Sequence, residues 1–353
     1  MRYRNKIISL IAFILAFSIF LGGCGKKEDK EPLSKTEFMM DTVMTIKLYD
    51  KKDEEVLKKA FNRIKEIEDK MSNTIENSYI DKINKNAGKA PIEVDEEVYN
   101  LLVKAKKFAE LTDGAYEPTI GPLVELWNIK GEGKNDKHTI PKEEDIKKAL
   151  DKVDYKKLEL LDNNKVLLKD KGMKLDLGGI AKGYAGDEVK KVLEENGVKH
   201  AIIDLGGNIY ALGSKEGDKS WKIGIQNPKE ERGSYVGIVE VKENAVVTSG
   251  DYERYFEVDG KRYHHIIDSK TGYPSDNELS AISIISKSST DSDALSTALF
   301  VLGREKGAKV LSKLEDTEVL YITKSGKVYI SNGMKDKFTL KNPNFDLKIN
   351  EYK

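Results

Sequence analysis

The sequence of 353 residues contains one cysteine, Cys24, so a disulfide within the chain is excluded. It also lacks an excess of either charge, with 60 basic and 60 acidic residues. Residues 1–23 hold three basic and no acidic residues, which leaves 57 basic and 60 acidic residues, a net charge of −3, in the rest. Nucleic acid is therefore not an expected partner, and the mixed Lys and Glu runs indicate solvated helix faces.

Several motifs of common enzyme classes are missing as well. The chain has no Gly-Xaa-Ser-Xaa-Gly elbow and neither a Walker nor a Rossmann glycine pattern. Ser249 begins the segment Ser-Gly-Asp-Tyr-Glu-Arg-Tyr, but no catalytic triad can be assembled around it from spacing. These absences argue against a serine hydrolase and against the commonest nucleotide-binding folds.

The longest apolar run, Ile7–Leu21, is shorter than the roughly 20 residues that a membrane-spanning helix needs. Arg2, Arg4 and Lys6 precede it, so we expect residues 1–23 to be an export signal. Leu-Gly-Gly-Cys at 21–24 resembles the lipobox of bacterial lipoproteins, in which the cysteine, here Cys24, becomes the lipid-modified first residue. The alternative is an ordinary signal peptide with an incidental cysteine. Residues 24–35 then predict a flexible tether, and 36–353 the folded domain.

Hydrophobic periodicity predicts helices and hairpins in alternation. From Asp53 to Met71, apolar residues recur every three or four positions, which is typical of a helix with one buried face. We expect further helices from the Asp95 cap to Gly114 and over 141–153, 184–196, 291–302 and 305–314. Strands are expected over 38–49, 157–161, 165–169, 200–204 and 280–286, through most of 221–267, and in a hairpin over 319–330.

No long linker interrupts these elements, and a strict βαβ rhythm is absent. The pattern predicts one compact α+β unit, in one or two lobes, with mixed and antiparallel sheets flanked by helices.

Leu-Asp-Leu-Gly-Gly-Ile-Ala-Lys-Gly at 175–183 is the most informative segment. It places Asp176, two glycines and Lys182 where we expect a strand to lead into a helix. Glycines allow a close backbone approach, and a helix N-terminus offers unpaired N–H groups, so the segment suits an anionic ligand such as phosphate. A simple tight turn is the alternative. Asp-Leu-Gly-Gly recurs at 204–207, which indicates either an old duplication or two strands ending in similar turns.

Asp291, Asp293 and Thr297 stand near the start of a predicted helix. Asp293 and Thr297 are four residues apart, so their oxygens share one helical face and could bind a hard cation such as Mg²⁺. Aspartates that cap a helix start and favour its dipole are the alternative explanation.

His264 and His265 account for half of the histidines in the chain, and Asp268 follows them closely. A histidine there could move a proton near neutral pH. Zinc binding is the alternative, although adjacent strand residues face opposite ways and helical zinc-ligand spacing is absent. The loop Gly114–Leu123 surrounds Tyr116 with turn formers, and its aromatic side chain could stack on a ring or, with Trp127, fill the core.

Taken together, these segments resemble the ApbE family of FAD:protein FMN transferases. The likeness covers most of the chain after the signal, and the matching segments occur in the family's order. They are Met40–Thr42, Met71–Ser72, Gly114–Trp127, Leu175–Gly183, Asp204–Gly207, Thr248–Tyr255, His264–Pro274 and Asp293–Gly303.

The resemblance implies a T-fold-related domain on a lipoprotein at the outer face of the cell membrane. It implies cleavage of FAD, transfer of FMN to a Thr or Ser of a partner through a phosphoester, and release of AMP. The partners would be subunits of Rnf- or Nqr-type electron-transfer complexes or reductases with covalent FMN. It places Mg²⁺ on the Gly179 carbonyl, Asp293 and Thr297, a proton acceptor at His265, oriented by Asp268 or its loop, and FAD on Met40, Ala115, Tyr116, Glu117, Asp176, Lys182 and Ile267.

The chain departs from the family pattern at a few positions. Thr74 stands where an aromatic is common, Tyr79 follows Ser78 in place of an acid, and Asp41 replaces a glycine after Met40. Tyr116-Glu117 replaces Phe-Asp but keeps an aromatic and an acid.

Two other functional classes fit some of the same residues. A flavin-scavenging lipoprotein could bind FAD, or hydrolyse it, without modifying any protein. A metal pair together with a proton acceptor favours transfer, because storage needs neither. A solute-binding lipoprotein predicts two similar lobes, and the sequence shows no such pattern.

Overall fold

A nine-stranded sheet forms the centre of the computed structural model, which describes residues 31–129, 139–231 and 233–350. The strand order is β1-β2-β6-β7-β10-β13-β14-β15-β17, and every neighbouring pair is antiparallel except β15 and β17. In chain order these strands are Leu33–Met39, Thr42–Leu48, Ala201–Leu205, Asn208–Leu212, Asn244–Gly250, Leu279–Ser286, Glu318–Thr323, Lys327–Ile330 and Asp346–Ile349.

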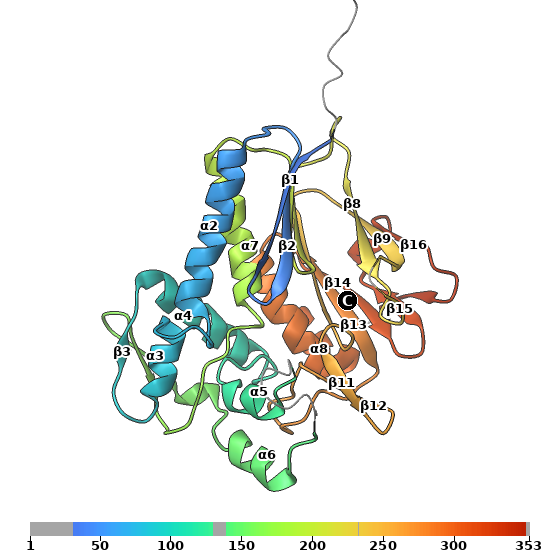
Figure 1. Cartoon of the computed structure of the whole chain (residues 1–353). Helices are drawn as coiled ribbons and strands as arrows, with labels where there is room; N and C mark the ends of the chain where they lie inside the picture. Colours follow the sequence, from blue (N-terminus) through green and yellow to red (C-terminus); the bar gives the residue numbers. More distant parts are fainter. Residues whose placement is uncertain (1–30, 130–138, 232, 351–353) are drawn as a thin grey trace, which may run out of the picture.

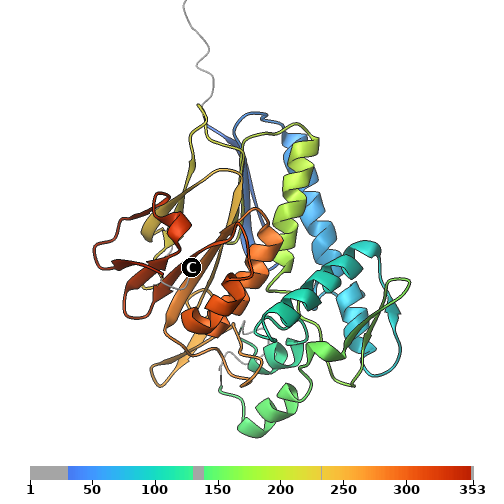
Figure 2. The same cartoon turned by 180° about the vertical axis from the view of Figure 1, so that it is seen from behind.

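Helices α2, α7 and α8 cover one face of this sheet, and a small sheet of β8, β9 and β16 covers the other (Figures 1 and 2). The predicted α+β fold, with antiparallel and mixed sheets flanked by helices, is therefore confirmed. The bounds are α2 Glu54–Met71, α7 Ala181–Glu195, α8 Ser289–Leu311, β8 Trp221–Gln226, β9 Tyr235–Val241 and β16 Phe338–Leu340.

The remaining elements gather around one end of the large sheet, in the lower part of Figure 1. They include a three-stranded sheet of order β3-β5-β4 and the hairpin β11-β12. The helices are α3 Tyr79–Lys85, α4 Glu96–Leu111, α5 Gly121–Trp127 and α6 Glu143–Leu150, and the strands are β3 Ile92–Glu93, β4 Leu158–Leu161, β5 Lys165–Leu168, β11 Tyr255–Val258 and β12 Lys261–His264.

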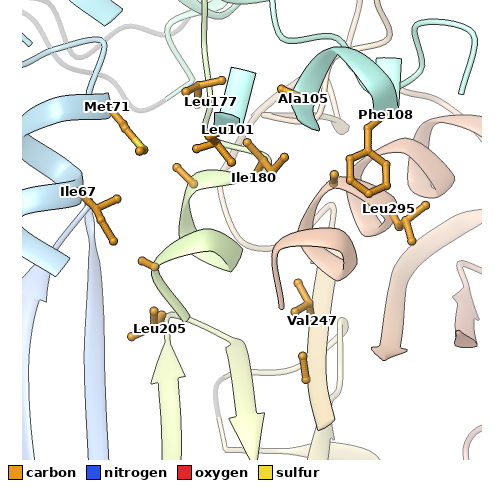
Figure 3. Close-up of a cluster of buried hydrophobic side chains, with 14 of the residues drawn as sticks. Ile67, Met71, Leu101, Ala105, Phe108, Leu177, Ile180, Leu205, Val247 and Leu295 are labelled. Carbon is orange, nitrogen blue, oxygen red and sulfur yellow. The ribbon is translucent and has the colours of Figure 1, made fainter. Parts of the chain in front are cut away.

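Helices α2 and α4 begin where the sequence predicts. The Asp53 side chain accepts a hydrogen bond from Glu55 N, and the Asp95 side chain accepts one from Val98 N, so each aspartate caps a helix. The apolar positions of both helices are buried, as the helical period requires. Figure 3 shows Ile67 and Met71 of α2 and Leu101 and Phe108 of α4 in one cluster between the helices and the sheet.

The segment predicted as one strand over 38–49 is instead the hairpin β1-β2. Met40 and Asp41 both have positive φ, 47° and 59°, and form the two-residue turn between Met39 and Thr42. The sequence pattern hid this turn because neither residue is the glycine that such geometry favours. β1 begins at Leu33, three residues before Thr36, where we expected the folded domain to start.

Helices α7 and α8 differ from the expectation at their ends. α7 begins at Ala181, before the predicted Tyr184, and so includes Lys182. The two predicted helices 291–302 and 305–314 form α8, which starts at Ser289 and has a non-helical break at Gly303. The expected break between the two predicted helices is therefore present as a kink at Gly303.

The predicted signal peptide, Cys24 and most of the predicted tether lie outside the described residues. Among the residues that are described, none of the helices has the length and apolarity required to cross a membrane.

Candidate active site

The glycine turn before α7 is fixed by its flanking residues. Leu177 and Ile180 are buried in the core (Figure 3), so the two glycines between them are held at a defined position. The Asp176 carboxylate accepts hydrogen bonds from Gly178 N at 2.7 Å and from Asn73 Nδ2 at 2.8 Å. We expected a strand before this turn, but the structure has none there. In its place, Lys174 forms an isolated β-bridge with Ile120.

The second Asp-Leu-Gly-Gly, at 204–207, closes the hairpin between β6 and β7. The two copies thus occupy different structural contexts. The second leads to Asn208, whose Oδ1 lies 3.3 Å from Lys182 Nζ.

Helices α7 and α8 pack together through glycine. A Cβ placed on Gly183 would lie 2.3 Å from Ser289 O and 2.7 Å from Asp293 Cβ. This proximity lets Gly183 N donate to Asp293 Oδ2 at 2.8 Å. Lys182 Nζ lies 3.7 Å from the other oxygen, Asp293 Oδ1, so a lysine and a buried aspartate face each other.

Residue Asp187 of α7 fixes the start of α8. Its carboxylate accepts hydrogen bonds from Ser289 N, Thr290 N and Thr290 Oγ1 at 2.8, 2.9 and 2.5 Å. A side chain from one helix thus satisfies the free N–H groups at the start of the next. Sequence reasoning missed this residue, because it lies 102 positions before the first amide that it caps.

The three predicted metal ligands lie close together. A Cβ on Gly179 would be 3.0 Å from Thr297 Oγ1 and 3.4 Å from Tyr116 Cε2. Asp293 lies one turn before Thr297 on the same face of α8. Gly179 and Thr297 are thus neighbours, and a carbonyl, a carboxylate and a hydroxyl are the kinds of oxygen that a hard cation binds.

The charge environment of this group fits a cation. The Asp293 side chain is buried, yet within the described chain it has one hydrogen bond and one ion pair at 3.7 Å. Burial, followed by the charges of Asp293 and Asp176, raises the pKa of Tyr116 well above its ordinary value. The Tyr116 hydroxyl is also buried and has no hydrogen-bond partner among the described residues. A bound cation would compensate this concentration of negative charge.

His265 is held by the backbone of Arg254. Arg254 O accepts a hydrogen bond from His265 N at 3.1 Å and lies 3.3 Å from His265 Nδ1. A carbonyl can only accept, so the proton of the neutral ring is on Nδ1 and Nε2 carries the lone pair. Desolvation lowers the pKa of His265 to about 3, and the positive charges of Arg254 and Lys182 contribute to this shift.

Asp268, which we expected to help orient His265, has another role. Its Oδ1 accepts from Lys270 N at 2.8 Å, and its backbone bonds to Tyr273 and Gly272, so it shapes its own loop. The contact to the imidazole comes from Arg254, in the segment Thr248–Tyr255, where the sequence analysis assigned no role to the arginine.

His264 points away from His265. Its Nε2 donates to Ser275 O at 2.8 Å, and it lines a separate pocket of about 390 Å³ together with Asp251 and Lys324. The described residues contain no cluster of three or more His, Cys, Asp or Glu side chains that could hold a metal.

The Gly114–Leu123 loop is shaped by its own hydrogen bonds. Glu117 accepts from Thr119 N and Oγ1 through Oε1 and from Tyr155 N through Oε2. Both carboxylate oxygens are thus occupied within the protein, and burial raises the pKa of Glu117. Ala115 is buried in the same loop, and its N–H donates to Thr112 O at 3.2 Å.

Ile267 and Met40, which the sequence predicts at the FAD site, belong to segments that flank the candidate site. Ile267 packs with the buried Trp127 in a cluster of its own, and Trp127 therefore belongs to the core. Ser269 Oγ donates to Gly114 O at 2.6 Å and joins the histidine loop to the Tyr116 loop. On the other side, Met40 N donates to Glu68 Oε1 at 2.7 Å, while Arg254 Nη2 donates to Asp41 O at 2.9 Å.

The comparisons with known proteins agree on one family. Residues 40–321 match the family model described as the ApbE family. The chain is 36% identical over 346 residues to the FAD:protein FMN transferase of Treponema pallidum (strain Nichols), covering 93% of this chain and 94% of that protein. It is 38% identical over 312 residues to the FAD:protein FMN transferase of Klebsiella pneumoniae (strain 342), covering 88% and 95%.

Solved structures give the same result. The ApbE protein from Thermotoga maritima superposes with a TM-score of 0.80 at 36% identity, covering 87% of this chain and 99% of that one. The flavin transferase ApbE from Vibrio cholerae superposes with a TM-score of 0.78 at 28% identity and the same coverage.

Proposed function

This chain belongs to the ApbE family and is an FAD:protein FMN transferase, and we propose that it transfers FMN to a Thr or Ser hydroxyl with the help of Mg²⁺. In the proposed reaction the hydroxyl oxygen attacks the FMN phosphorus of FAD. The bond between this phosphorus and the bridging oxygen breaks, AMP leaves, and a phosphoester forms. The proton of the hydroxyl passes to His265 Nε2.

One observation supports this proposal most directly. Lys182 Nζ lies 3.7 Å from Asp293 Oδ1, and Asp293 shares a helical face with Thr297, which adjoins Gly179. Phosphoryl transfer depends mainly on positioning and charge neutralisation, and these residues can provide both.

Each residue of the site has a part in the proposed reaction. A Mg²⁺ ion on the three oxygen ligands would supply charge for the phosphoryl oxygens. Lys182 would pair with the pyrophosphate, and His265 would accept the proton. The negative charge of bound FAD would raise the pKa of His265 and so strengthen the base when the substrate is present.

The test combines the purified chain without residues 1–23, FAD, Mg²⁺ and a flavoprotein subunit with a candidate acceptor threonine. We expect a fluorescent flavin band on a denaturing gel and an equal amount of AMP. AMP release with an unlabelled acceptor would identify a hydrolase and overturn the transfer reaction.

Metal dependence is tested in the same assay. A chelator and the substitution Asp293→Ala should each abolish labelling. Asp291→Ala is the matched control, because Asp291 lies two residues earlier on α8 and pairs with Lys104 at 2.5 Å. Equal loss in both variants, or full labelling by Asp293→Ala, would contradict the metal assignment.

We propose in addition that Cys24 is lipid-modified and holds the domain at the outer face of the cell membrane. The Leu-Gly-Gly-Cys sequence at 21–24 supports this proposal. The acceptors are then membrane flavoprotein subunits of the Rnf or Nqr type, or reductases with covalent FMN. Cys24→Ser should release the protein from the membrane fraction; a membrane-bound variant would refute the anchor.

A further inference from the structure

Two exposed apolar side chains face each other at the tip of the β1-β2 hairpin. Phe38 and Val43 are directly opposite in the ladder, and their exposures are 72% and 49%. These are the two most exposed large hydrophobic residues of the described chain. Single exposed apolar residues are ordinary, but an adjacent pair forms a patch that another molecule can cover.

The turn that carries this patch is fastened from both sides. Met40 N donates to Glu68 Oε1 of α2 at 2.7 Å, and Arg254 Nη2 donates to Asp41 O at 2.9 Å. Both turn residues hold positive φ without being glycine, a conformation that costs free energy and persists only where contacts enforce it. The patch is therefore displayed in a fixed position.

The same arginine joins the patch to the catalytic base. Its carbonyl accepts from His265 N and faces His265 Nδ1, while its guanidinium holds the turn. Phe38 and Val43 are thus linked to His265 through the Met40-Asp41 turn and Arg254. A protein that presents a hydroxyl to His265 must cover the neighbouring surface.

Strand β1 can extend that contact. It is an edge strand of the large sheet in the described part of the chain and pairs only with β2 (Figure 1). Ser34, Thr36 and Phe38 alternate along its exposed face. An edge strand offers backbone groups to an extended peptide, and pockets or patches beside it select side chains.

We propose that the tip formed by Phe38 and Val43, with the edge of β1, is the docking surface for the polypeptide acceptor. It binds an apolar side chain next to the acceptor Thr or Ser, in an extended segment paired with β1. This inference rests on the proposed transfer reaction, which requires a protein as second substrate.

The first test measures labelling against acceptor concentration for the double variant Phe38→Ser, Val43→Ser. We expect KM for the acceptor to rise about tenfold or more, as for loss of interface anchors, with an unchanged Kd for FAD. Ile349→Ser is the control, since Ile349 is 42% exposed on β17, at the opposite edge of the same sheet. An unchanged acceptor KM in a double variant that folds would overturn the docking site.

The second test replaces Phe38 with benzoylphenylalanine, which preserves an aromatic group, and irradiates the full chain with the acceptor. A crosslink to the acceptor supports the proposal. A crosslink to residues 1–30 of the same chain, or to a second copy, assigns the patch to that occupant and overturns it. If the wild-type protein labels no acceptor at all, the transfer reaction fails, and this result is distinct from a failure of docking.

Discussion

His265 owes its charge state to its neighbours. Its surroundings lower the pKa to about 3, so the free enzyme keeps a neutral imidazole down to well below pH 5. Desolvation is the largest cause, and the charges of Arg254, His264 and Lys182 also disfavour a proton on the ring. A base of such low pKa accepts protons weakly, which is why the proposed reaction needs the charge of FAD beside it.

We predict that Arg254→Met raises the pKa of His265, because a positive charge beside it is lost. Activity requires the neutral ring and is lost as pH falls through the pKa. The acidic limb of kcat/KM should therefore move to higher pH, whereas Arg254→Lys should keep it low. Arg262→Met is the control, since Arg262 pairs with Asp251 beside His264. An acidic limb that stays in place in Arg254→Met would contradict this account.

His264 should make stability depend on pH. Burial lowers its pKa to about 4, from about 6.5 in the unfolded chain. Between these values the unfolded chain binds a proton that the folded protein excludes, so the free energy of unfolding falls as pH is lowered through this window. We expect His264 to contribute up to about 1.4 kcal/mol per pH unit to this slope, measured by urea unfolding. His265, whose pKa is lowered to about 3, contributes in the same direction, so His264→Gln should reduce the slope without abolishing it; an unchanged slope would exclude His264 as a cause.

For single residues, spacing in the sequence predicted only those neighbours that lie within the same helix. Asp293 and Thr297 are four residues apart on one helix, so their common face follows from the helical period alone. Arg254 acts on His265 through a backbone carbonyl, and every residue has one. Its side-chain type therefore carried no signal for that role.

Helices α7 and α8 define the candidate site through their contact. Gly183 allows this contact, because any side chain there would meet the backbone of Ser289. Ser289 O cannot move without shifting the start of α8, where Asp187 holds it. The geometry of the site therefore depends on the distance between two helices more than on any loop.

We predict that Gly183→Ala lowers both stability and Mg²⁺ affinity. Overpacking at such a contact costs about 1–3 kcal/mol, and separating the helices moves Asp293 and Thr297 away from Gly179. Thermal unfolding and Mg²⁺ titration of labelling measure the two effects. Gly224→Ala on β8 is the control, because a Cβ there has its nearest neighbour at 3.6 Å. A normal Mg²⁺ requirement in Gly183→Ala would show that the contact does not position the ligands.

Long periodic helices were predictable, and so were the short strands β4 and β5, but the shortest helices were not. α2 spans 18 residues with a cap and a clear apolar face, and sequence pattern found it. α3 and α5 have seven residues each, too few for a helical period to emerge, and both were missed. The β1-β2 turn was missed because Met40 and Asp41 adopt a conformation that tertiary contacts impose.

Across the whole molecule, the candidate site joins distant parts of the chain. Gly179 belongs to the segment before α7, whereas Asp293 and Thr297 belong to α8. An unfolded chain cannot hold these oxygens together, so ligands should bind only the folded protein.

We predict that Mg²⁺ with FAD raises the melting temperature measured by calorimetry. Binding at 100 times Kd stabilises the fold by about 2.7 kcal/mol. Thr297→Ala should lose the part of the shift that depends on Mg²⁺, and Thr339→Ala on β16 should retain it. The same Mg²⁺ effect in both variants would remove Thr297 from the metal site.

The hydrogen bond from Gly183 to Asp293 spans 110 residues of sequence and has a consequence for the order of folding. During synthesis, the segment with the glycine turn exists long before the helix that completes the site. Contacts this distant in sequence form late, since they require closure of a long loop. A nascent or partly refolded chain therefore has secondary structure before it has activity. Recovery of labelling after dilution from denaturant should lag behind recovery of helical signal, with the docking of α8 onto α7 as the step that starts catalysis.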